Sequence, residues 1–210
     1  MKKLDLRKIW KHLYQPSARK IQVVEVPELS FLMVDGRIEK GRSPADSKSF
    51  LEAVQALFGV SYTLKFQSKL RKKNAIDYPV MALEALWWVE DGRFEISKPD
   101  NWSWRAMMMQ PEHITTEMFA EALDQLRHKK PSPGLERLRL ERFIEGPCIQ
   151  SMHIGPYSTE PATVERMHAF AEKNGYTLAN RHHEIYLSDP RRCPPAKMKT
   201  VLRHGVEKKV

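Results

Sequence analysis

The spacing of apolar residues predicts a short amphipathic helix near the start of the chain, followed by strands. Within residues 3–14, apolar side chains recur at helical intervals and the lysines occupy the opposite side. Residues 20–38 have the β-branched and aromatic content of two strands, which Pro27 interrupts. A longer helix is expected within residues 43–66, where capping residues precede an apolar run of helical period. We expect this helix to end or bend at Gly59.

The middle of the chain alternates strand and helix signals in the same way. Residues 77–96 indicate a strand, a turn at Asp91-Gly92 and a second strand. A short strand and then a helix from about Thr115 follow, and the Pro-Ser-Pro-Gly run at 131–134 is the clearest loop.

The last third repeats this order. Residues 135–158 predict two strands, residues 159–176 a helix, and residues 182–188 and 198–208 two final strands. The pattern therefore predicts an α+β protein with strands and helices in both halves.

A loose internal repeat connects the two halves. In each half, a strand ends in a glycine-containing turn and leads through a helix to a strand with a central glutamate and aromatic neighbours, ALEALWW in one and HHEIYLS in the other. This duplicated β-α-β unit places Glu84 and Glu184 in related positions. If the halves share one sheet with helices on one face, the other face is left as a ligand cleft. We expect a single domain, with 1–19 as a helical extension, 20–130 as the first repeat and 135–210 as the second.

The stretch His182-His183-Glu184 lacks the spacing of a zinc site. A zinc-binding helix of the HExxH type needs a second histidine one turn after the first, and none follows here. On a strand, neighbouring side chains point to opposite faces, so the two histidines cannot easily share one ion. We therefore expect no metal. We also expect Ile185 to pack under the helices, which would turn Glu184 and Tyr186 toward the opposite face.

Composition favours a soluble protein of a reducing compartment. Hydrophobic residues make up 41% of the chain and charged residues 29%, and no apolar run approaches the ~20 residues that span a bilayer. Cys148 and Cys193 stand alone, without the paired spacing of a disulfide framework. We expect a cytoplasmic protein with no membrane partner, and no phosphate-binding loop or dinucleotide fingerprint predicts a cofactor.

The positive charge is confined to the first third of the chain. Residues 1–73 hold 16 Lys and Arg against 7 Asp and Glu, whereas residues 74–210 hold 19 of each, which accounts for the net charge of +9. Basic clusters can mark a nucleic-acid surface, but no recognised DNA-binding motif accompanies these. We interpret them as solvated helix faces and do not expect a nucleic-acid partner.

Five segments in order resemble the GyrI-like small-molecule-binding family: LEALWW, WSWRAMMMQPEHIT, CIQSMHIGPYSTEPAT, HHEIYLSDPRR and KMKTVLRHGV. The resemblance covers roughly residues 20–205. It implies duplicated β-α-β-β repeats with pseudo-twofold symmetry, an antiparallel sheet with helices on one face, and a concave ligand site between the repeats. The chain resembles a branch of this family that hydrolyses the cyclopropane of cyclopropanoid DNA-alkylating antibiotics, such as yatakemycin-like compounds. The helix-turn-helix of the family's transcription regulators is missing from the sequence.

The resemblance also implies that a hydrophobic aromatic ligand lies beside a glutamate of the HHEIYLS strand, which is Glu184. A carboxylate among aromatic side chains loses solvation and is suited to act as a general base. Tyr186 shares its face and could donate its hydroxyl. Further ligand contacts are expected from aromatic, sulfur-containing and polar side chains of both halves: Tyr62, Glu84, Trp87, Trp88, Trp104, Met108, His153 and Tyr157. Trp87 and Trp88 point to opposite faces, so at most one of them reaches the ligand.

Three functions remain open at this point. In the first, Glu184 activates a water that opens the cyclopropane of a genotoxic antibiotic, with Tyr186 stabilising charge on the conjugated carbonyl. In the second, the same site binds or senses drugs without changing them. In the third, the protein inhibits gyrase by direct interaction. The sequence gives no indication of the oligomeric state.

Overall fold

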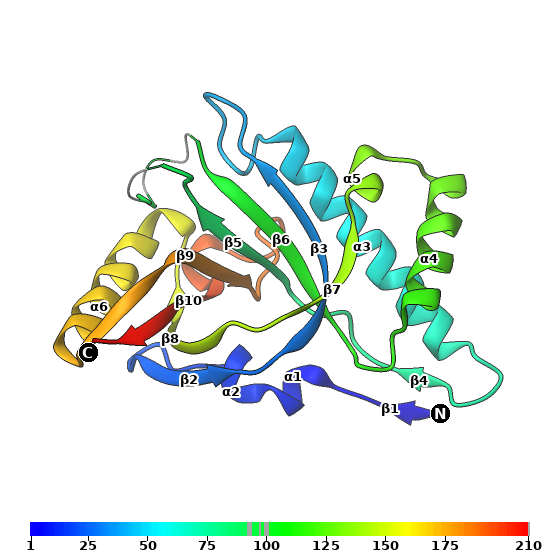
Figure 1. Cartoon of the computed structure of the whole chain (residues 1–210), viewed down its shortest axis with the longest axis horizontal. Helices are drawn as coiled ribbons and strands as arrows, with labels where there is room; N and C mark the ends of the chain where they lie inside the picture. Colours follow the sequence, from blue (N-terminus) through cyan, green and yellow to red (C-terminus); the bar gives the residue numbers. More distant parts are fainter. Residues whose placement is uncertain (92–93, 97, 99–100, 210) are drawn as a thin grey trace.

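One antiparallel sheet runs through the whole molecule (Figure 1). The computed structural model describes residues 1–91, 94–96, 98 and 101–209. Its strands are, in chain order, β2 (Gln22–Val26), β3 (Leu29–Arg37), β5 (Leu83–Trp88), β6 (Ser103–Gln110), β7 (Arg139–Phe143), β8 (Gly146–Ile154), β9 (Tyr176–Tyr186) and β10 (Lys199–Lys208). In the sheet they follow the order β2-β8-β10-β9-β5-β6-β3-β7, and every neighbouring pair is antiparallel.

The helices differ strongly in length. They are α1 (Leu6–Ile9), α2 (Lys11–Tyr14), α3 (Lys48–Lys69), α4 (Thr116–Lys129), α5 (Pro133–Glu136) and α6 (Glu160–Lys173), with single 3-10 turns η1 (Tyr157–Thr159) and η2 (Pro195–Lys197). Two short strands, β1 (Lys2–Lys3) and β4 (Ile76–Asp77), pair in parallel apart from the main sheet. Within the described part of the chain, no helix combines the length and apolarity that a bilayer crossing requires.

The strand order confirms the predicted duplication and α+β class. Each half follows the order β-β-α-β-β: β2, β3, α3, β5 and β6 in the first, and β7, β8, α6, β9 and β10 in the second. The sheet order is symmetric about the β9–β5 pair, with β8 and β3, and β10 and β6, at matching positions. The halves also exchange their first strands, because β2 pairs with β8 and β7 pairs with β3. This exchange ties the two repeats into one sheet.

Different elements cover the two faces of the sheet. α3 packs on β3 and β6, and α6 packs on β8 and β9; we call this side the helix face. Figure 1 shows α6 and α3 flanking the central strands β9 and β5. The other side, which we call the N-terminal face, is covered by α1 and α2, where Leu13 and Tyr14 are buried. Both faces of the central strands are therefore removed from water.

The helix predicted to end or bend at Gly59 continues through it to Lys69, so that prediction is wrong. A Cβ at Gly59 would lie 3.5 Å from Leu126 of α4, which is an ordinary van der Waals contact, so the packing of α4 does not require a glycine there. Contacts between the helices outweigh the poor helix propensity of a single glycine.

Two loop predictions also need correction. The loop expected at 131–134 contains the start of α5, which opens with Pro133 at its first position. The strand expected after the Asp91-Gly92 turn does not form at Phe94, Glu95 or Ile96, which are irregular. Residues 92–93, the centre of that prediction, lie outside the described residues.

Trp104 packs flat against bare backbone in the core of the first half. Gly36 of β3 is paired with Trp104 of β6, and a Cβ at Gly36 would lie 2.3 Å from the indole ring. The ring is fully buried and also meets Phe50 of α3 edge-on at 5.2 Å. A glycine is thus required at position 36 by the close approach of the ring.

Substitution by alanine should change the free energy of unfolding in opposite directions at Gly36 and Gly59. Gly36→Ala should lower the free energy of unfolding by about 1–3 kcal/mol, because the buried indole has to move. Gly59→Ala should raise it by about 0.5–1 kcal/mol through helix propensity, because ordinary contact space is open there. Urea denaturation of both variants beside the parent protein measures this. Equal effects of the two substitutions would contradict the described packing.

Candidate functional site

Alternation along β9 places neighbouring side chains on opposite faces of the sheet. Glu184 lies opposite Leu202 of β10, and Leu202 belongs to the apolar cluster that contains Met167 of α6. Glu184 therefore lies on the helix face, as do His182 and Tyr186 at alternate positions.

The prediction that Glu184 and Tyr186 face away from the helices is consequently wrong. Ile185 and His183 occupy the N-terminal face instead, and both are buried there. The physical reason is the N-terminal segment: α1 and α2 supply an apolar cover for the second face, so Ile185 does not need the long helices to be buried.

Glu184 is held in a small polar cluster on the helix face. Its Oε1 lies 3.1 Å from Nε2 of His182, whose Nδ1 lies 2.9 Å from Nε2 of His204. One carboxylate oxygen of Glu160, at the start of α6, lies within 4.8 Å of ligand-type atoms of both His182 and Glu184. Glu184 is 6% exposed and Glu160 2% exposed, so two carboxyl groups share one buried site.

Aromatic rings surround this polar cluster. Trp87 of β5 donates its indole N–H to the Tyr186 hydroxyl at 3.2 Å, and Tyr157 of η1 packs edge-on against the Tyr186 ring at 5.8 Å. The half-buried Phe94 lies between two rings, 4.8 Å from Trp102 and nearly parallel to His182 at 5.7 Å. The surroundings are therefore apolar walls with a few convergent polar groups, as small-molecule sites have.

Burial sets the protonation states of this cluster. Burial and the neighbouring Glu184 raise the pKa of Glu160 from 4.5 to about 9, with the Thr200 hydroxyl opposing the shift. Burial and Glu184 also raise the pKa of Tyr186 well above its usual value. Burial and the adjacent His182 lower the pKa of His204 well below its usual range, so His204 is neutral. At neutral pH the site thus contains a protonated Glu160 and a neutral Tyr186.

Glu160, His182 and Glu184 are also the one group of His, Cys, Asp and Glu side chains, among the described residues, that lie close enough together for a cation. Both nitrogens of His182 already have partners, so binding an ion would break the contact with Glu184. We interpret the group as a hydrogen-bonded cluster. The absence of a metal stays a prediction.

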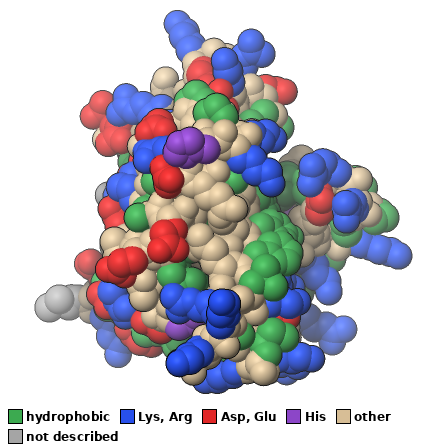
Figure 2. Space-filling model, turned by 90° about the vertical axis from the view of Figure 1, so that its right-hand side faces the viewer, with side chains coloured by type: hydrophobic (Ala, Val, Ile, Leu, Met, Phe, Trp, Pro, Cys, Tyr) green, Lys and Arg blue, Asp and Glu red, His purple; other side chains and the backbone are tan. Residues whose placement is uncertain are grey.

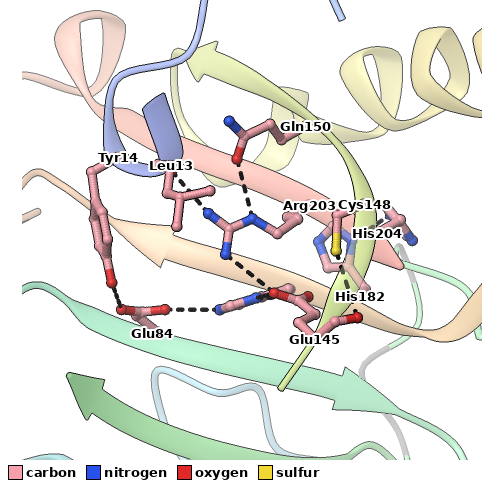
Figure 3. Close-up of polar contacts among 10 residues, drawn as sticks. Leu13, Tyr14, Glu84, Glu145, Cys148, Gln150, His182, Arg203 and His204 are labelled. Carbon is pink, nitrogen blue, oxygen red and sulfur yellow. Dashed lines mark hydrogen bonds and ion pairs between the residues drawn. The ribbon is translucent and has the colours of Figure 1, made fainter. Parts of the chain in front are cut away.

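A second polar cluster fills the N-terminal face (Figure 3). Tyr14 of α2 donates its hydroxyl to Glu84 at 2.5 Å, and Nε2 of His183 lies 3.1 Å from the same carboxylate. Nδ1 of His183 lies 3.0 Å from Glu145, which also accepts from Arg203 at 3.1 Å. These side chains come from both repeats and from the N-terminal segment, and all are buried.

The charges of this second cluster balance. Burial alone would lower the pKa of His183, but Glu145 and Glu84 outweigh it and raise the pKa to about 9. Burial alone would raise the pKa of Glu145, but His183 and Arg203 lower it to about 2. Arg203 also donates to the Leu13 carbonyl oxygen at 2.9 Å, which fixes α2 on the sheet. The cluster is fully enclosed and satisfied, so we assign it a structural role.

The structure brings some of the predicted ligand contacts to Glu184. Trp87 and Tyr157 both contact Tyr186, its neighbour on the strand. His153 lies on the helix face of β8, where Nδ1 is 2.9 Å from the Thr163 hydroxyl of α6. Burial lowers the pKa of His153, and the Pro156 carbonyl oxygen and Glu184 oppose this shift.

The other predicted contacts lie elsewhere. Trp104 and Met108 are fully buried on β6, the strand on which α3 packs. Glu84 belongs to the structural cluster, and Trp88 lies on the same face, where Arg181 stacks over its ring at 4.6 Å. Tyr62 is 49% exposed on the outward side of α3.

Figure 2 shows the side of the molecule at the right of Figure 1, where apolar side chains (green) lie beside Lys and Arg side chains (blue).

A groove of about 540 Å³ opens on the N-terminal face, between the N-terminal segment and the sheet. Tyr14, Met152 and Leu187 line it, and Arg7 and Lys199 contribute positive charge. Leu187 lies on the side of β9 away from Glu184, so this groove is separate from the carboxyl pair.

Comparison with known proteins settles the family. The model of the GyrI-like small molecule binding domain matches residues 99–204. The crystal structure of an uncharacterised conserved protein from Listeria innocua is 40% identical, with a TM-score of 0.88 over 97% of this chain and 100% of that one. This chain belongs to the GyrI-like family. A hydrolase from the same organism is also 40% identical, with a TM-score of 0.85 over 98% of this chain and 100% of that one.

More distant relatives share only the fold. The C-terminal domain of EcmrR is 12% identical to this GyrI-like chain, with a TM-score of 0.54 over 90% of this chain and 98% of that one. No curated protein matches the chain.

Three residues of the candidate site were not predicted from the sequence. Glu160 appeared only as the start of a helix, and His204 only as part of the last strand. Phe94 fell in a segment that was predicted as a strand. A helix that begins with a glutamate two residues after the Tyr157-Ser158 turn is a weak signal, because acidic residues are common at helix starts for reasons of charge alone.

The raised pKa of His183 predicts how stability depends on pH. Its pKa rises from 6.5 unfolded to about 9 folded, so its stabilisation is complete below pH 6.5 and is lost as the pH rises through about 9. Glu160 contributes in the same direction, since its pKa is also raised, and Glu160→Gln removes that share. His204 opposes this trend near its unfolded pKa of 6.5, because its pKa is lowered in the fold, so the test uses the upper part of the window, toward pH 9. Measured there by urea, the free energy of unfolding of this variant should still fall with pH. A flat or rising profile would contradict the protonated state of His183.

Proposed function

We propose that this GyrI-like protein binds bulky aromatic small molecules on the helix face, between α3 and α6, and hydrolyses strained cyclopropanoid DNA-alkylating compounds. The observation that carries the proposal is Glu184, a carboxylate buried among aromatic rings in a small-molecule-binding family. The hydrolase from Listeria innocua, 40% identical along nearly the whole chain, favours catalysis over binding alone.

Phe94 indicates how a flat ligand fits the site. Its ring lies between Trp102 and His182, nearly parallel to the latter. A planar ligand ring that displaces Phe94 would stack on the same two rings, and each such contact contributes about 0.5–1.5 kcal/mol beyond burial. Phe94 is half-buried and belongs to no helix or strand, so its displacement by a ligand would break no ladder hydrogen bond of the sheet.

The chemistry follows from the contacts of Glu184. His182 fixes one carboxylate oxygen at 3.1 Å, which orients the group. A water beside the carboxylate gives up a proton to Glu184 as its oxygen attacks the electrophilic cyclopropane carbon. Tyr186 shares the face and presents a neutral hydroxyl that can donate a hydrogen bond to the conjugated carbonyl oxygen. The opened product no longer alkylates DNA.

A second function uses the same site without chemistry. The family is described as a small-molecule-binding domain, which binding alone would satisfy. In that case an aromatic drug would raise the melting temperature and be recovered unchanged, which mass spectrometry of the recovered compound shows directly.

The role of Glu184 predicts the effect of one isosteric substitution. Glu184→Gln should reduce ring opening of a cyclopropanoid antibiotic by ~10²–10⁴-fold, the usual contribution of a general base. Ligand affinity should change little, because the aromatic walls remain. Absorbance of the conjugated chromophore follows the reaction, and Glu207→Gln, an exposed glutamate on β10, is the control. Turnover by Glu184→Gln at the parental rate would refute the assignment.

A further inference from the structure

We propose that Glu160 is the proton donor of this site, a carboxylic acid that protonates the substrate oxygen while Glu184 accepts the proton of the attacking water. This inference rests on the proposed function and assigns the second half of its acid–base chemistry. It concerns a residue at the start of α6, which comes from a different element than Glu184.

The position of Glu160 is unusual for a glutamate that only caps a helix. It is 2% exposed, and among the described residues its Oε1 has no hydrogen-bond partner. A buried ionised carboxylate with an unpartnered oxygen is costly, whereas a protonated one carries an O–H that can be directed at a ligand. One carboxylate oxygen of Glu160 lies within 4.8 Å of ligand-type atoms of Glu184 and His182, so the carboxyl group with the unpartnered oxygen belongs to this cluster.

Two carboxyl groups so close together in a buried site cannot both be ionised. His182 lies within hydrogen-bonding distance of Glu184 and not of Glu160, so the negative charge is favoured on Glu184. Burial and this charge raise the pKa of Glu160 to about 9. The titratable groups of neighbouring elements around the pair are His182, Glu184 and Tyr186 of β9, Tyr157 of η1, His153 of β8 and His204 of β10. Burial lowers the pKa of His153 and of His204, so neither of these two histidines places a positive charge beside Glu160.

Tyr186 is the other candidate donor, and it is the poorer acid. Burial and Glu184 raise its pKa well above 10, and its hydroxyl oxygen already accepts a hydrogen bond from Trp87. Glu160 loses a proton more readily and recovers one from solution at neutral pH. A hydrogen bond from Tyr186 and a proton from Glu160 can serve the same substrate oxygen.

The resulting step balances. The water oxygen forms a bond to the cyclopropane carbon, and the water proton goes to Glu184. The cyclopropane carbon–carbon bond breaks, and its electron pair moves through the conjugated ring system to the carbonyl oxygen, where Glu160 delivers its proton. The product is a neutral phenol. Transfer of one proton from Glu184 to Glu160 then restores the starting state.

The first experiment needs no substrate. In the protein with ¹³C-labelled glutamate side chains, the Glu160 signal, assigned by its loss in Glu160→Gln, should titrate far above the signals of exposed glutamates such as Glu165. In Glu184→Gln the same signal should titrate at lower pH, because the neighbouring negative charge is gone. A Glu160 signal that titrates in the same pH range as the exposed glutamates would overturn the proposal. A stoichiometric divalent metal lost in Glu160→Gln would overturn it too, since a coordinated carboxylate holds no proton.

The second experiment tests the role in turnover. Glu160→Gln keeps the shape of the protonated acid, so it should fold and bind an aromatic cyclopropanoid with unchanged KM. Its kcat should fall by ~10²–10⁴-fold, and the alkaline loss of activity that the donor role predicts for the parent should be absent from the variant. Glu165→Gln, on the exposed side of the same helix, should behave as the parent. An unchanged kcat in Glu160→Gln would refute the donor role.

The two proposals fail in distinguishable ways. If no cyclopropanoid is turned over by the parent protein, the proposed function fails, while the titration of Glu160 still stands or falls by itself. If turnover depends on Glu184 and not on Glu160, only the donor assignment is lost.

Discussion

The arrangement of this molecule depends on one constraint: both faces of strand β9 are buried, and the period of a strand is two residues. Alternation sends His182, Glu184 and Tyr186 under the long helices and His183 and Ile185 under the N-terminal segment. Each polar residue therefore enters a dry environment and has to find partners there. The polar residues find a full set of partners on the N-terminal face and an incomplete set on the helix face. We therefore assign a structural role to the first group and a chemical role to the second.

In the buried cluster of the N-terminal face, carboxylates and cationic groups compensate one another. Glu84 and Glu145 face His183 and Arg203, and Tyr14 completes the contacts of Glu84. On the helix face, compensation is incomplete, because two carboxyl groups lie together and one oxygen of Glu160 has no partner among the described residues. A buried polar cluster in which every group has a partner stabilises a fold. A cluster with unpartnered polar atoms among aromatic rings is typical of a ligand-binding site.

Much of the fold could be predicted from the sequence, since it rests on local periodicity. The duplication and the opposite orientation of Trp87 and Trp88 follow from apolar spacing and alternation, whereas the antiparallel sheet was expected from the family resemblance. The exchange of β2 and β7 between the halves could not be predicted, because it depends on pairing between distant strands. The passage of α3 through Gly59 was missed for a related reason, since the packing of α3 on α4 and on the sheet outweighs the poor helix propensity of one glycine.

The candidate site was predicted in part. Glu184 was chosen through family resemblance, and the face on which it lies was wrong, because nothing in the pattern of β9 reveals that α1 and α2 cover the second face. Glu160 was missed because its proximity to Glu184 arises only when α6 packs on the sheet. Proximity across elements, rather than any local motif, creates the carboxyl pair.

The central claim is that ligands bind on the helix face beside Glu184 and not in the groove beneath the N-terminal segment. A crystal structure of the protein soaked with a cyclopropanoid or its ring-opened product tests this most directly. The account predicts ligand density between α3 and α6, stacked on His182 or Trp102 and within hydrogen-bonding distance of Glu184. Density in the groove lined by Tyr14 and Leu187, with the carboxyl pair unchanged, would contradict it.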